Sequence, residues 1–212
     1  MARQTAVQGQ ACVPAVGTRR AQIQASALRH FSRRGYHGAN LRAIAADAGM
    51  EAGSLYYHYE SKEALLFDII STALDERLRA LRRAIVGDAS PPERLRQAVR
   101  FHVTYHAEQR DVARVVHREW EHLTGRFREA IQERRDAYQR AFEEILQAGI
   151  EEGRFPPQDV KLVVFAILAI GHGVTRWYRP GGRLSAAAVA DCYAELTLQA
   201  VLASAAQVHA AA

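Results

Sequence analysis

The 212-residue sequence predicts an all-α protein, with a small N-terminal three-helix domain and a larger C-terminal helical domain. Apolar residues recur at the three- and four-residue spacing of a helix face, and no stretch shows the alternation of a β-strand. A compact helix-turn-helix pattern lies between Asn40 and Lys62. Residues 1–62 hold eight Lys and Arg against three acidic residues, which accounts for the whole formal net charge of +5.

The helix-turn-helix pattern is readable residue by residue. Asn40 is placed to cap a short helix whose apolar face is Leu41, Ile44, Ala45 and Ala48. Gly49 ends that helix, because glycine enters the left-handed C-cap conformation without a Cβ penalty. The next segment carries its apolar side on Met50, Leu55 and Tyr59, so its opposite side faces outward.

The outward side of this second helix is small, polar and aromatic, and it contains no acidic residue. Such a face suits a reading helix in the major groove of DNA. We expect Asn40 and Lys62 to contact phosphates, Arg42 a phosphate or a base edge, and Gly53 to let the backbone approach closely. The predicted DNA-contacting residues are Asn40, Arg42, Gly53, Ser54, Tyr56, Tyr57, His58 and Lys62.

The charge distribution points the same way. A basic N-terminal part on an electrically balanced body is typical of a module that binds phosphates. The longest apolar run, residues 162–170, is about half of the ~20 residues that a membrane span requires. No secretory signal is evident, and Cys12 and Cys192 fit no ligand spacing, so a cytoplasmic protein without a membrane partner is expected.

The remaining elements follow from caps and breaks. Residues 1–17 are predicted to be a disordered tail, and Thr18 to cap a first helix that Gly35 ends. Ser61 caps a long helix to about Ile85, the link between the two domains. The body is expected to form helices over residues 93–108, 111–123, 124–152, 159–178 and 185–208. We predict a DNA-binding domain at 18–62 and a ligand-binding and dimerisation domain at 63–212.

The last two helices carry more apolar surface than a small monomer needs to bury. Two such helices and their symmetry mates would form a four-helix interface, which predicts a homodimer. A purely intramolecular core is the alternative.

Histidines suggest one further chemistry. His102 and His106, and then His117 and Glu121, stand four residues apart and share helix faces, as metal ligands often do. No third ligand at fixed spacing and no nucleophile motif accompanies them. We therefore predict neither a metal site nor an enzyme, and interpret these histidines as core or solvated residues.

Aromatic residues and one basic motif mark a candidate ligand site. The body aromatics that could surround a cavity are Phe101, Tyr105, Trp120, Phe127, Tyr138 and Phe142, with ordinary core packing as the alternative. The motif Arg176-Trp177-Tyr178-Arg179 closes an apolar helix just before Pro180-Gly181-Gly182. Arginine near a helix C-terminus is also favoured by the helix dipole, so a structural role competes with ligand binding.

Residues 20–70 resemble the DNA-binding domain of TetR-family transcriptional regulators. The matching blocks are ALRHFSRRGYHGANLRAIAADAG, AGSLYYHY and SKEALL. The resemblance implies a regulator that dimerises through its last two helices, binds a palindromic operator in double-stranded DNA and responds to a small-molecule effector.

Three C-terminal blocks, GIEEGRF, RWYRPGG and Leu184-Ser185, resemble the acyl-CoA-responsive, KstR-type branch of that family. The resemblance implies that Arg176 and the residue four before it, here His172, line the ligand site. A tryptophan stands at the His172 position in the relative, so the acyl group itself is left open. The expected function is a repressor that leaves its operator on binding an acyl-CoA, with no cofactor. The alternatives are a sensor of hydrophobic drugs or of a metal ion, and an architectural DNA-binding protein without effector.

Overall fold

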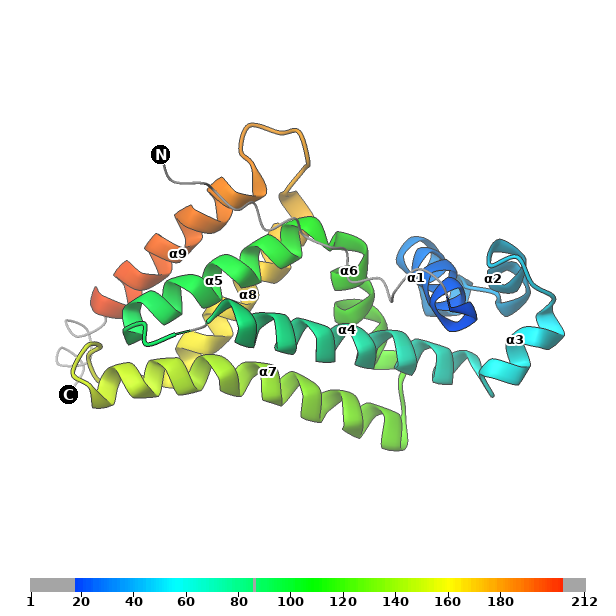
Figure 1. Ribbon diagram of the computed structural model, residues 1–212, viewed down its shortest axis with the longest axis horizontal. Helices are drawn as coiled ribbons and strands as arrows, with labels where there is room; N and C mark the ends of the chain where they lie inside the picture. Colours follow the sequence, from blue (N-terminus) through cyan, green and yellow to red (C-terminus); the bar gives the residue numbers. More distant parts are fainter. Residues whose placement is uncertain (1–17, 86, 204–212) are drawn as a thin grey trace.

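A computed structural model describes residues 18–85 and 87–203, and this part of the chain is entirely helical (Figure 1). The helices are α1 (Arg19–Gly38), α2 (Leu41–Asp47), α3 (Ala52–His58), α4 (Lys62–Ala84), α5 (Pro91–Glu108), α6 (Arg110–Arg118), the 3-10 helix η1 (Glu119–His122), α7 (Gly125–Glu151), α8 (Val160–Trp177) and α9 (Ala186–Ala203). Helices α1–α3 form a head at one end, and α4 runs from that head into the body (Figure 1). The all-α prediction is confirmed.

The predicted N-terminal caps are confirmed by their hydrogen bonds. The side chain of Thr18 accepts from the Ala21 N–H, that of Asn40 from Arg42, and that of Ser61 from Ala64. Gly49 follows α2 with a φ of +68°, a conformation that favours glycine. The predictions for residues 1–17 and for helix beyond Ala203 concern segments outside the described residues.

Gly35 breaks the first helix as predicted, but a short helical segment follows the break. Gly35 interrupts α1 with a φ of +70°, but helical geometry resumes and continues to Gly38. A tertiary contact accompanies this kink, because the carboxylate of Glu119 accepts a hydrogen bond from the Tyr36 N–H at 2.7 Å. The ring of Tyr36 also stacks on that of His122, with centroids 5.1 Å apart. The connection between head and body thus includes α1 and η1.

Buried apolar side chains form two clusters that meet along α4. The head cluster includes Phe31, Ile44, Leu55 and Ile70, together with Val115 from α6. The body cluster begins on α4 at Leu81 and joins α5, α7, α8 and α9. Because α4 is continuous and α6 packs into the head cluster, no break in packing coincides with residue 62. The domain boundary proposed there stays a prediction.

Asp68 on α4 is the polar centre of the head. The residue is 8% exposed, and its carboxylate accepts hydrogen bonds from Tyr59 Oη at 2.5 Å and Gln24 Nε2 at 2.7 Å and pairs with the Arg20 guanidinium. Burial alone would raise the pKa of Asp68, but the hydrogen bonds from Arg20 and Tyr59 outweigh it and hold the pKa below its usual value. Asp68 thereby fastens α1 and the end of α3 to α4.

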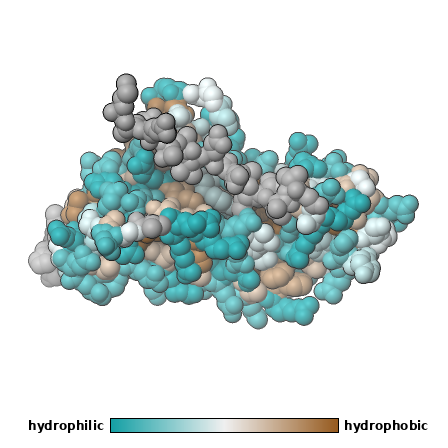
Figure 2. All heavy atoms as spheres, viewed as in Figure 1, coloured by the Kyte–Doolittle hydropathy of each residue, from teal (hydrophilic) through white to brown (hydrophobic). Residues whose placement is uncertain are grey.

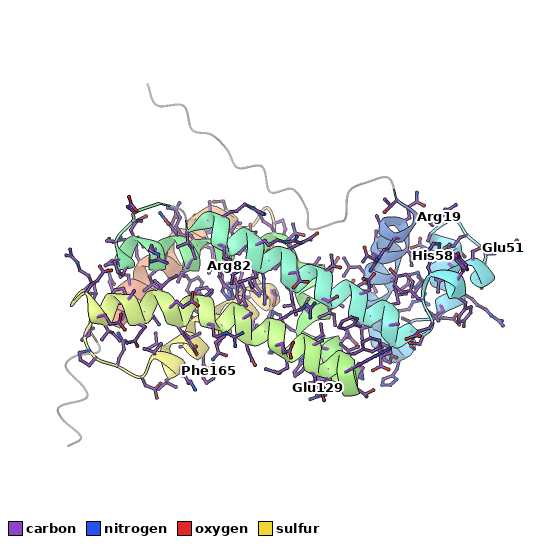
Figure 3. The ribbon with its side chains drawn as sticks, turned by 60° about the horizontal axis from the view of Figure 1, so that its bottom comes forward. Arg19, Glu51, His58, Arg82, Glu129 and Phe165 are labelled. Atoms are coloured by element: carbon purple, nitrogen blue, oxygen red, sulfur yellow. The ribbon has the colours of Figure 1, made fainter. Side chains whose placement is uncertain are left out.

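Helices α8 and α9 leave large apolar side chains in solvent. The exposed members on these two helices are Leu162, Phe165, Trp177, Leu196 and Leu202. Figure 3 labels Phe165, which lies on α8 at the outside of the body, and Figure 2 shows brown apolar patches among the teal surface. By length and composition alone, α8 and α9 are apolar enough to cross a membrane, with mean hydropathies of 1.4 and 1.2. Core and interface helices of soluble proteins meet the same criterion, so this finding is weak evidence for a membrane.

We predict that Asp68→Ala destabilises the fold by about 3 kcal/mol, because it leaves Tyr59 and Gln24 without their charged acceptor. Asp75→Ala is the matched control, since Asp75 on the same helix forms a part-exposed pair with Arg134 and should cost under about 1 kcal/mol. Urea unfolding measures both values.

The same carboxylate predicts a pH dependence. Its folded pKa is lowered, so its contribution is complete above the unfolded pKa of about 4 and is lost as pH falls through the folded pKa. Asp68→Ala should therefore flatten the decline in stability below about pH 4. An unchanged acid limb in the variant would contradict this role for Asp68.

Candidate DNA-binding surface and buried polar cluster

Helix α3 presents its predicted reading face at the tip of the head. Figure 3 labels Glu51, just before α3, and His58 at its end, both far from Arg82 in the body. Leu55 is fully buried and fixes the helix, while Tyr56 is 55% and Tyr57 90% exposed. Gly53, Ser54 and His58 are exposed as well. The structure thus brings the small, polar and aromatic side chains of α3 together on one open surface.

Gly53 has no packing reason to be glycine. A Cβ atom added there would meet nothing within 4 Å, and the backbone is ordinary helix. Glycine in an exposed helix costs about 1 kcal/mol relative to alanine, so its presence favours a partner that approaches the backbone from outside.

The residues predicted to contact phosphates have partners within the head. Asn40 uses its side chain to cap α2, with Oδ1 2.8 Å from the Arg42 nitrogen. The ammonium of Lys62 donates to the Ala39 carbonyl at 3.2 Å and lies 4.5 Å from the centre of the Tyr36 ring. Arg42 is exposed. The roles of these three residues on DNA remain predictions.

A second polar feature lies inside the body, where four helices meet. We call it the polar cluster, and it consists of Arg77 from α4, His102 and His106 from α5, His117 from α6 and Tyr138 from α7. Tyr138 Oη lies 3.0 Å from His102 Nδ1, and His106 Nε2 lies 3.0 Å from His117 Nε2. Arg77, His102, His106 and Tyr138 are at most 6% exposed.

The hydrogen bonds define the tautomers of the neutral histidines. His106 Nδ1 must donate to the His102 carbonyl at 2.8 Å, so its Nε2 accepts from His117 Nε2–H. His102 Nε2 donates to the Leu168 carbonyl, and its Nδ1 accepts from the Tyr138 hydroxyl.

Burial, followed by the charge of Arg77, lowers the pKa of His106 to about 3. Burial raises the pKa of Tyr138 to about 12. At neutral pH the permanent charge of the polar cluster is therefore that of Arg77.

The predicted ligand residues are only partly brought together. Tyr138 and Phe142 are buried, with ring centroids 5.6 Å apart. The rings of His172 and His117 meet edge to face, with centroids 3.8 Å apart. The ring of Phe101 lies beside that of Tyr105, with centroids 6.0 Å apart, and Tyr105 lies between Phe101 and the polar cluster.

Two other predicted residues lie further out. Trp120 is partly buried, and the guanidinium of Arg135 lies 4.4 Å from the centre of its ring. Arg176 is exposed in the last turn of α8, one helical turn beyond His172.

Arg77 was missed by the sequence reasoning, although a signal was present. It stands three residues after Leu74 and four before Leu81, within the apolar stripe of the long helix. A charged residue in such a stripe predicts a buried polar site.

No group of three or more His, Cys, Asp or Glu residues is arranged to hold a metal ion within residues 18–85 and 87–203.

We predict that Tyr57→Ala weakens binding to operator and non-operator DNA alike, because a phosphate contact positions the protein without reading sequence. Loss of one such contact should lower the slope of log K against log salt by about 1. Anisotropy titrations at several salt concentrations measure this, with Lys62→Ala tested beside it. Identical slopes for Tyr57→Ala and the wild type would show that Tyr57 does not touch the backbone.

Comparison with known proteins gives two family matches. The family described as bacterial regulatory proteins, tetR family, matches residues 23–69, and the tetracyclin repressor-like C-terminal domain matches residues 88–201. The HTH-type transcriptional repressor KstR2 of Mycobacterium tuberculosis is 35% identical over 187 residues, covering 86% of this chain and 92% of that protein.

Two solved structures share the architecture. A TetR-family regulatory protein from Rhodococcus RHA1 has a TM-score of 0.82 and 33% identity, covering 87% of this chain and 97% of that one. AibR, solved in complex with isovaleryl coenzyme A and operator DNA, has a TM-score of 0.78 and 28% identity, covering 84% of this chain and 97% of that one. With both domains matched and a repressor related along most of the sequence, the chain belongs to the TetR family of DNA-binding transcriptional repressors, which are regulators and not enzymes.

Proposed function

We propose that this repressor acts in the cytoplasm as a homodimer and leaves a palindromic operator when an acyl-CoA thioester binds in its body. The observation that carries the proposal is the aromatic and polar cluster between α4, α5, α6 and α7. This cluster includes Arg77 of α4, the helix whose first half is bonded to the head through Asp68. The similarity to AibR, which was solved with a coenzyme A thioester and operator DNA, supports the ligand class.

The body supplies the two kinds of residue that a CoA thioester requires. Phe101 packs on Tyr105 and Tyr138 packs on Phe142, and the rings of His106 and His102 connect these two pairs, an arrangement suited to an acyl group. Three exposed arginines lie at the end of α8 and in the turn that follows, where they could bind the phosphates of the CoA group in solvent. They are Arg176, Arg179 and Arg183. His172 lies one turn before Arg176 and faces His117, so it would stand between these two regions.

Release of DNA requires the ligand to bind one arrangement of the heads more tightly than the other. A ligand with equal affinity for both arrangements would shift nothing. We propose that α4 transmits the difference, because its first half contacts the head and its second half carries Arg77 of the polar cluster. The two α3 helices of a dimer would then no longer match half-sites about 34–36 Å, or a multiple of this, apart.

The dimer is proposed to form through α8 and α9. A groove of about 300 Å³ between them is lined by apolar residues that include Val163, Ile170 and Leu196. Phe165 and Leu196 are more than half exposed in the single chain, and a symmetry-related pair of helices would cover them.

We predict that Arg176→Ala preserves the fold and DNA affinity but raises the acyl-CoA concentration needed for DNA release by about tenfold, because a charge-assisted contact to phosphate is lost. A DNA-release titration with acyl-CoAs and the corresponding free acids measures this. Arg140→Ala, an exposed substitution on α7, is the control and should respond like the wild type. If no thioester releases DNA, the effector assignment fails while the repressor assignment stands.

We predict that Leu196→Glu raises the dissociation constant of the dimer by about 100-fold or more, since each dimer would bury two unpaired carboxylates. Leu184→Glu makes the same chemical change at an exposed site outside α8 and α9 and should leave the dimer intact. Sedimentation velocity distinguishes the species. A dimeric Leu196→Glu variant at low micromolar concentration would place the interface elsewhere.

A further inference from the structure

Arg77 is a buried cation whose hydrogen-bonding capacity is not filled by its neighbours. The residue is 6% exposed, and its Nε atom has no hydrogen-bond partner. Its guanidinium carbon lies 4.0 Å from the centre of the Tyr138 ring and 5.9 Å from that of Tyr105. A ring face attracts a cation but offers no in-plane lone pair to an N–H group. The Nε–H therefore points to a missing acceptor.

A second cation lies near Arg77, and the acceptor nitrogens of His102 and His106 are already used, while His117 Nδ1 is a second buried atom without a hydrogen-bond partner. His102 and His106 each use both ring nitrogens for other partners, namely Tyr138, Leu168, the His102 carbonyl and His117. Burial and then the charge of Arg77 lower the pKa of the neighbouring Arg135. A buried charge is normally paired, as Asp68 is in the head, because an unfilled one carries its full desolvation cost. The body therefore contains an unpaired buried charge at Arg77, whereas the buried charge of Asp68 in the head is paired.

We infer that Arg77 is a ligand-binding residue, whose guanidinium receives an oxygen acceptor, a carbonyl or a carboxylate, on the part of the effector that enters the body. This inference rests on the proposed function and adds a site on α4 that the sequence did not suggest. Arginine presents its N–H donors in a rigid fork that matches such oxygens. Arg77 follows Asp68 by nine residues, or about 13.5 Å along the helix. An effector oxygen that accepts a hydrogen bond from Arg77 thus contacts the same helix that holds the head.

The test compares thioesters that differ only in this oxygen. The probes are the CoA thioesters of straight-chain C6, C8 and C10 acids, each plain, with a ketone on the penultimate carbon, or with a terminal carboxylate. The free acids without CoA form a second set. DNA release and direct binding by calorimetry are measured for the wild type, Arg77→Met and Arg77→Lys. Arg82→Met is the matched control, because Arg82 is exposed on the same helix.

We expect the wild type to bind at least one oxygen-bearing probe about 10- to 100-fold more tightly than its plain counterpart. Arg77→Met should lose that preference, keep its affinity for the plain probe and bind DNA like the wild type. Its melting temperature should be equal or higher, since an unpaired buried charge is removed. Arg77→Lys should retain part of the preference through its charge. Arg82→Met should behave as wild type throughout.

Each other outcome is decisive. Equal responses of the wild type and Arg77→Met to every plain and oxygen-bearing pair overturn the inference while acyl-CoA sensing stands. A lower melting temperature with lost DNA binding in Arg77→Met assigns Arg77 a structural role and also overturns it. If only free acids bind, and do so through Arg77, the thioester proposal fails and the inference holds. Absence of binding by any probe rejects both.

Discussion

The structure depends on one uninterrupted helix, α4, that belongs to both the head and the body. Its first half contributes Leu66 and Ile70 to the head cluster, and Leu81 belongs to the body cluster. A regular helix rises about 1.5 Å per residue, so its two halves keep a fixed separation and rotation. Any change in how the body grips α4 must therefore move or turn the segment that holds α1 and α3. Figure 1 shows this helix running between the two parts.

The two buried charges of α4 are treated in opposite ways. Asp68 receives hydrogen bonds from Tyr59 and Gln24 and pairs with Arg20, so its charge is compensated and it stabilises the head. Arg77 lies against tyrosine faces with an unfilled Nε–H, and the nearby histidines are held neutral. A buried charge whose hydrogen bonds are all made holds its neighbours in place. A buried charge with an unfilled donor gains free energy when a suitable acceptor binds to it. This difference separates the part of the helix that supports the fold from the part we assign to the effector.

A second connection between head and body runs through α6 and η1. His117 belongs to the polar cluster, and Glu119, two residues later, holds the Tyr36 N–H beside the kink at Gly35. Glu63, in the first turn of α4, accepts hydrogen bonds from Thr124 at the start of α7. The head is therefore held at α1 by η1, which follows His117 of the polar cluster, and at the start of α4 by the start of α7. An effector at the site we propose in the polar cluster would act on the head through α6 and η1 as well as through α4.

Local chemistry was readable from the sequence alone. The caps at Thr18, Asn40 and Ser61, the turn at Gly49 and the open face of α3 depend on residues within a few positions of one another, so their spacing determined them. The sequence also assigned the family, because those local features occur in the order that TetR-type heads share. Only the tertiary structure decided what depends on distant segments: the partners of Asp68, 44 and 48 residues away at Gln24 and Arg20, the continuation of α1 past Gly35, and the burial of Arg77. Spacing along a helix fixes which residues share a face, but which neighbour covers that face, and whether a charge there is paired, is set by how the helices pack together.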